Sequence, residues 1–112
     1  MNIAYEKLNT LLLHVKDGYA PNTLRAYRAD MEEFIAYCAE TGASPLPADP
    51  FVVAEFLLQT TDCGIKAATI RRKASSISAI HRLSYLEDPT KHPEVKIAIR
   101  KVIIPPEFRT GG

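Results

Sequence analysis

Paired arginines in a stretch without acidic residues are the side chains of this 112-residue chain best suited to bind a polyanion. Residues 65–86 contain no Asp or Glu, and their cations are Lys66, Arg71, Arg72, Lys73 and Arg82. Arginine can bond guanine O6 and N7 bidentately or hold a phosphate, and an α-helix fits the major groove of duplex DNA. The stretch therefore predicts a DNA contact, with a solvated helix face as the alternative.

The same stretch predicts a helix over residues 67–85 with one apolar arc. The arc holds Ile70, Ala74, Ile77, His81 and Ser84, with Ile80 at its edge. The opposite side holds Arg71, Ser75 and Arg82, with Ala68, Arg72 and Ala79 beside them. Small residues there would let DNA approach the backbone, and Thr69 near the helix start could bond a phosphate. His81, on the apolar arc, is expected to be a hydrogen-bonded core residue.

A second basic site is predicted at the start of an earlier helix. Arg25 and Arg28 lie within its first two turns, and no acid occurs between Gly18 and Ala29. Two helix starts that present arginine on one surface would form a clamp; ordinary surface arginines are the alternative. A weaker third candidate is the group Lys96, Arg100 and Lys101.

Acidic residues are concentrated in residues 29–64, which contain no Lys or Arg. These acids are Asp30, Glu32, Glu33, Glu40, Asp49, Glu55 and Asp62. We expect them to face water, away from any phosphate-binding surface. No His completes a ligand set with Glu32, Glu33 and Glu40, so no metal site is predicted.

No catalytic motif is present, and no nucleophile is paired with a base. We therefore predict no catalytic residue, no cofactor and no small-molecule substrate. Cys38 and Cys63 form no CxxC motif and are expected to be small buried residues in a reducing compartment, with a disulfide between them left open. Without a long apolar run or a signal peptide, neither a membrane partner nor secretion is predicted, and cytoplasmic residence is the default.

Apolar spacing predicts an all-α fold, a compact bundle of four or five short helices. Helices are expected over residues 2–16, 23–41, 67–85 and 93–104, with another from Asp49 to a close at 62–64. Gly18 and Gly42 are the expected stops, and Asn22 or Thr23 the expected cap of the second helix. The third helix should bury Val53, Phe56, Leu57 and Thr60.

The order of these segments resembles a known family. Residues 21–28, PNTLRAYR, lead to AYC at 36–38; PADP at 47–50 leads to VAEFLL; and GIKAATI at 64–70 leads to ISAIH. This arrangement resembles the core-binding domain of tyrosine recombinases, the phage integrases, over about residues 8–104. The resemblance implies a SAM-like helical domain that forms half of a clamp around duplex DNA.

The resemblance also implies which residues face DNA. They are Arg25, Ala26 and Arg28 from one helix, and Ala68, Thr69, Arg71, Arg72 and Ser76 from the other; charge adds Lys66 and Lys73. Duplex DNA and other protomers on it are the implied partners. Residues 1–106 would be the domain and 107–112 a linker toward a separate catalytic domain, so the chain itself is not expected to be an enzyme. The alternative is a helical protein–protein interaction module with no DNA role.

Overall fold

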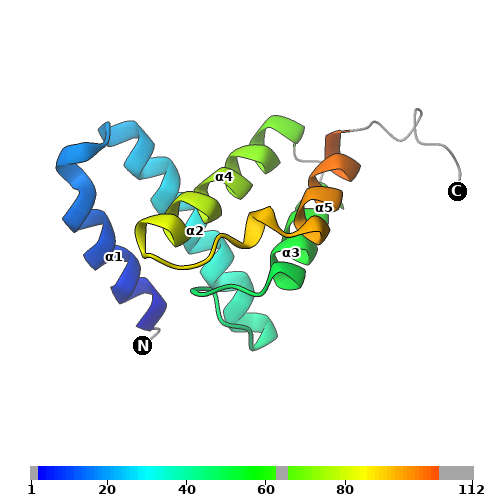
Figure 1. Cartoon of the computed structure of the whole chain (residues 1–112), viewed down its shortest axis with the longest axis horizontal. Coiled ribbons are helices and arrows are strands. Elements are labelled where there is room, and N and C mark those ends of the chain that lie inside the picture. Colours follow the sequence, from blue (N-terminus) through cyan, green and yellow to red (C-terminus); the bar gives the residue numbers. More distant parts are fainter. Residues whose placement is uncertain (1–2, 63–65, 104–112) are drawn as a thin grey trace, which may run out of the picture.

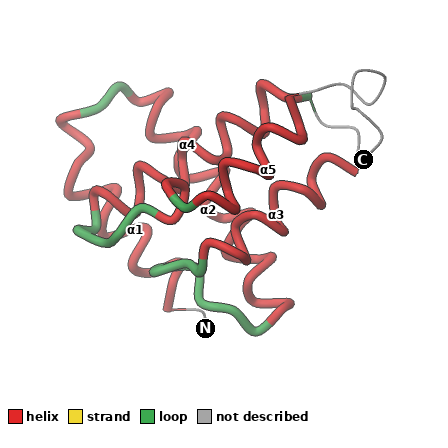
Figure 2. The backbone as a smooth tube through the Cα atoms, turned by 45° about the vertical axis from the view of Figure 1, so that its right-hand side comes forward, coloured by secondary structure: helices red, strands yellow, loops and turns green. Residues whose placement is uncertain are grey.

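The structure, a computed structural model, describes residues 3–62 and 66–103 (Figure 1). Its elements are α1 (Ile3–Val15), a 3-10 turn η1 (Lys16–Gly18), α2 (Pro21–Thr41), α3 (Pro50–Asp62), α4 (Ala67–Leu83), η2 (Pro89–Lys91) and α5 (Pro93–Ile103). No strand occurs over the described ranges, as the tube in Figure 2 shows. The predicted all-α bundle is confirmed.

The start of α2 differs from the prediction. Pro21 occupies the first turn, and the N-cap is Ala20 in an extended conformation with no side-chain hydrogen bond. Proline suits this position because its fixed φ is already helical and its missing N–H has no partner there anyway. Asn22 and Thr23 are therefore inside the helix, and the expected capping role was wrong. Asn22 Oδ1 instead accepts a hydrogen bond from Arg25 Nη1 at 3.1 Å.

The predicted helix end at Gly42 is confirmed. At Gly18 the chain instead ends a 3-10 turn, η1, that follows α1. Gly42 has φ +76°, and its N–H donates to the Cys38 carbonyl. Glycine adopts this left-handed conformation without the steric cost that a Cβ would add. Gly18 lies in η1, and Gly42 is the glycine with positive φ among the described residues. The start of α3 agrees with expectation, since Asp49 Oδ1 accepts from the Phe51 N–H at 2.8 Å.

Three pairings of helices enclose the core. α2 packs on α4, α3 on α5, and α1 on α2 (Figure 1). The predicted stripe of α3 is buried in full, and the apolar arc of α4 is buried from Ile70 to His81. Ala79, predicted beside the exposed side, is also buried, because α4 is covered by α2, α3, α5 and η2 together. No helix of the described chain is both long and apolar enough to span a membrane.

Cys38 is part of this core, as predicted. Burial raises the pKa of its thiol to about 11, so the group stays protonated and behaves as a small apolar side chain. Cys63 lies outside the described residues, so the structure does not test the alternative of a Cys38–Cys63 disulfide.

His81 is fully buried and hydrogen-bonded, which confirms its predicted core role. Its Nε2 accepts the Ala48 N–H at 2.9 Å, so the proton must be on Nδ1, which lies 2.8 Å from the Ile77 carbonyl oxygen. This tautomer joins α4 to the loop before α3. Burial lowers the pKa of His81, opposed in part by the bond to Ile77.

We predict that acid destabilises the domain through His81. The folded state binds this proton less readily than the unfolded chain, so the contribution is fully present above about pH 6.5 and decreases as the pH falls below it. One proton changes the free energy of unfolding by at most about 1.4 kcal/mol per pH unit. Urea denaturation between about pH 7.5 and about pH 5.5 measures this.

The matched variants are His81→Gln and the exposed His14→Gln. His81→Gln should flatten the pH dependence, whereas His14→Gln should leave it as in the wild type. An unchanged slope in His81→Gln would assign the effect to another group.

Candidate nucleic-acid interface

The predicted DNA-facing residues lie in the N-terminal half of α2, at the N-cap of α4 and in its first three turns. The two helices cross near their middles, and their N-terminal ends lie at the upper side of Figure 1. Arg25, Lys66, Ala68, Arg71 and Arg72 are exposed. Ala26, Arg28 and Thr69 are partly buried. Eight of the ten predicted positions are thus accessible to a large ligand.

Four of these cations are not neutralised by an acid within the described residues. Arg25 donates to Asn22 and Arg28 to Asn9, both of which are neutral side chains. Lys66 and Arg71 form no ion pair in the described part of the chain. Arg71 lines a shallow hollow of about 290 Å³ with Ser75, Ser78 and Arg82. These two helix starts therefore carry a local positive charge that the net charge of +1 does not show.

Arg72 differs from these four cations because a buried carboxylate of α2 binds it. Its Nη2 lies 2.9 Å from Asp30 Oδ1 and its Nε 3.2 Å from Asp30 Oδ2. The Asp30 side chain is only 1% exposed, whereas that of Arg72 is 53% exposed. The bond and the charge of Asp30 both raise the pKa of Arg72, which stays a cation.

Lys73 and Ser76 complete this ion cluster, which we define as Asp30, Glu33, Arg72, Lys73 and Ser76. The Ser76 hydroxyl donates to Asp30 Oδ2 at 2.6 Å, and Lys73 Nζ lies 3.9 Å from Asp30 Oδ1 and also donates to Glu33. Both residues are buried. The sequence predicts them on the DNA-facing surface; the structure places them between α4 and α2, because their own partners lie there.

Asp30 also corrects the expectation that the acids of residues 29–64 face water. Glu32, Glu33, Glu40, Asp49 and Glu55 are exposed as predicted, and the side chain of Asp62 lies outside the description. Asp30 is buried because it falls three residues after Tyr27 and four before Phe34, on the apolar stripe of α2. That spacing was the available signal, since an acid on a buried stripe requires a cationic partner.

Comparison with known proteins identifies the fold. Residues 10–88 match the model of the phage integrase N-terminal SAM-like domain. The chain belongs to this family. An integrase/recombinase xerD homolog of Selenomonas ruminantium is 31% identical over 86 residues, which are 74% of this chain and 25% of that protein. The tyrosine recombinase XerD of Chlorobaculum tepidum is 27% identical over 75 residues, 67% of this chain and 25% of the relative.

A third relative, the tyrosine recombinase XerD of Bradyrhizobium diazoefficiens, is 28% identical over 71 residues, 63% of this chain and 22% of that protein. The chain thus spans about a quarter of the length of the curated relatives that it matches. The predicted family and the predicted SAM-like integrase fold are confirmed.

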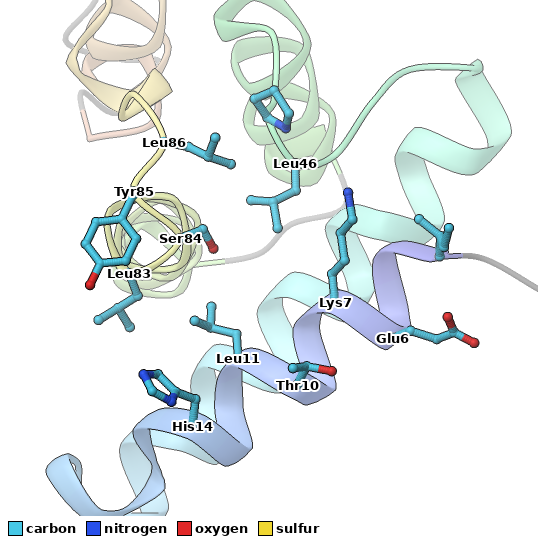
Figure 3. A pocket seen from close by; sticks show the side chains of 12 residues that line it. Glu6, Lys7, Thr10, Leu11, His14, Leu46, Leu83, Ser84, Tyr85 and Leu86 are labelled. Carbon is cyan, nitrogen blue, oxygen red and sulfur yellow. The ribbon is translucent and has the colours of Figure 1, made fainter.

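One hollow of this integrase domain is lined by none of the predicted DNA-facing residues (Figure 3). It measures about 700 Å³ and lies between α1 and the segment after α4, with Leu11, Leu46 and Leu86 directed toward its centre. Its polar side chains include His14 and Lys7. Among the described residues no group of three His, Cys, Asp or Glu side chains could hold a metal ion.

We predict that Asp30 is the costliest member of the ion cluster to remove. Asp30→Ala removes the buried carboxylate that Arg72, Lys73 and Ser76 share, and it leaves the buried Ser76 hydroxyl without its acceptor. We expect the free energy of unfolding to fall by about 3 kcal/mol. Glu33→Ala is the matched comparison, because the Glu33 side chain is 47% exposed and its removal leaves Lys73 with Asp30 at 3.9 Å. The loss should therefore be smaller than that of Asp30→Ala. Urea denaturation followed by circular dichroism compares them. Equal losses in the two variants would contradict a buried role for Asp30.

Proposed function

We propose that this domain binds duplex DNA as the core-binding domain of a site-specific tyrosine recombinase. The observation that carries the proposal is the group of exposed or half-exposed cations at the starts of α2 and α4, which no acid of the described chain neutralises. Phosphate contacts of this kind supply most of the affinity of a protein for DNA. The relatives, which are named as recombinases, support the same function.

The contact surface in this proposal is narrower than the predicted set. Arg25, Arg28, Lys66 and Arg71 attract phosphates, and Ala26, Ala68 and Thr69 let the duplex come close. Arg72 contributes hydrogen bonds more than charge, because Asp30 compensates it. Lys73 and Ser76 support the surface from beneath through the ion cluster.

Strand cleavage is proposed for another part of the recombinase. The domain holds and orients the site, and other protomers bind the same DNA. A protein–protein module with no DNA role would leave the positive charge of both helix starts without a partner, which favours the DNA-binding role. The isolated domain should bind DNA with a dissociation constant in the non-specific range of roughly 10⁻⁴–10⁻⁶ M.

The test is a titration with duplex DNA at several salt concentrations. The log–log slope of affinity against salt falls by about 0.9 for each phosphate contact that is lost. Arg25→Ala combined with Arg71→Ala should therefore weaken binding and make the slope shallower by about 1.8.

The control is Lys7→Ala combined with Lys91→Ala, which removes the same charge from exposed positions on α1 and η2. It should change the slope much less. Equal effects in the two double variants would show that the whole surface attracts DNA and that these helix starts are not the interface. No salt-dependent binding by the wild type would reject the proposed function.

A further inference from the structure

The geometry of the Asp30–Arg72 pair leaves one edge of the guanidinium free. Nε and Nη2 together face the two carboxylate oxygens, at 3.2 and 2.9 Å. A guanidinium has five N–H groups in one plane, so Nη1 and the second N–H of Nη2 are directed away from Asp30. The Arg72 side chain is 53% exposed, and Nη1 forms no hydrogen bond or ion pair with the described residues.

The carboxylate that holds Arg72 is itself fixed. Ser76 donates to Oδ2 at 2.6 Å, and Lys73 supplies a second positive charge 3.9 Å from Oδ1. Because Asp30 is buried and bonded from both sides, the plane of the Arg72 guanidinium is set before any ligand arrives. An unsupported arginine would lose rotamer freedom on binding, and that cost is avoided here.

We propose that Asp30 is a positioning residue that holds Arg72 so that its outer edge reads a guanine in the major groove. This inference rests on the proposed DNA-binding function. A fixed plane is of little use for a phosphate, which tolerates many approach directions, and Asp30 cancels much of the charge that would attract one. Bidentate bonding to guanine O6 and N7 instead depends on the direction of the edge.

The surroundings of Arg72 fit the same role. Ala68 lies one turn earlier on α4 and is exposed, so it leaves space for a base pair to approach. Arg71, which has no ion-pair partner within the described residues, is suited to a neighbouring phosphate. Adjacent arginines would thus divide two tasks between them.

The experiment selects from a pool of duplexes with randomised sequence and compares base preference before and after binding. The wild type should enrich guanine at one position. Asp30→Asn and Arg72→Lys should each reduce that preference, by about 5- to 150-fold for one bidentate contact. Total affinity should not fall together with base preference. Asp30→Asn removes a negative charge, so its binding to random duplex should be equal to that of the wild type or tighter.

A double-mutant cycle separates positioning from folding. Asp30→Asn should have no further effect on base preference when Arg72 is already alanine, because it acts only through that side chain. Circular dichroism shows whether each variant folds. If Asp30→Asn does not, Arg72→Lys decides, since lysine keeps the charge and cannot span both carboxylate oxygens.

The outcomes distinguish the inference from the function on which it rests. Retained guanine preference in Arg72→Lys or in folded Asp30→Asn would overturn the inference alone, as would salt-dependent binding with no base preference in the wild type. Absence of any DNA binding would overturn both.

Discussion

A single buried carboxylate, that of Asp30, determines how α4 is set against α2. Removing a charge from water costs several kcal/mol unless partners compensate it, and here all of the partners that bond it come from α4. Arg72, Lys73 and Ser76 reach it together only at one rotation of α4, because each residue turns the helix by about 100°. The same rotation directs Ala68 and Arg71 outward. The exposed surface of α4 is therefore a consequence of the ion pairing beneath it.

Because of this pairing, the segregated charges of the chain contribute both to the stability of the fold and to the charge of its surface. The acidic residues 29–64 and the basic residues 65–86 meet at one interface, where Asp30 and Glu33 face Arg72 and Lys73. Part of the basic excess thus stabilises the fold, and the remaining cations, Lys66, Arg71 and Arg82, form no ion pair within the described residues. A count of cations along the helix overstates the charge that DNA would encounter, because it includes the two that the acids already neutralise.

Local chemistry explains which features the sequence could predict. Gly42, Pro50 and Asp49 act on neighbouring backbone, and the stripe of α3 follows from helical spacing alone. Helical spacing could have placed Asp30 on the buried stripe of α2, but it could not identify the partner Arg72, which is 42 residues away and is brought close only by the packed fold. The predicted exposure near Ala79 was wrong for a related reason, because α4 is covered on more sides than an amphipathic surface helix. Asn22 is not the N-cap because α2 already begins at Pro21.

The two kinds of arginine at this surface should respond differently to salt. Arg25 and Arg71 form no ion pair within the described residues, and in the proposed role they would bind DNA through counterion release, which weakens steeply as salt rises. The Asp30–Arg72 pair is partly buried and is screened much less, and its outer edge offers directed hydrogen bonds with little net charge. In the proposed DNA-binding role, added salt should therefore lower the affinity for every sequence and leave the difference between sequences largely intact. A domain with a net charge of +1 would in this way be selective without a strongly basic surface.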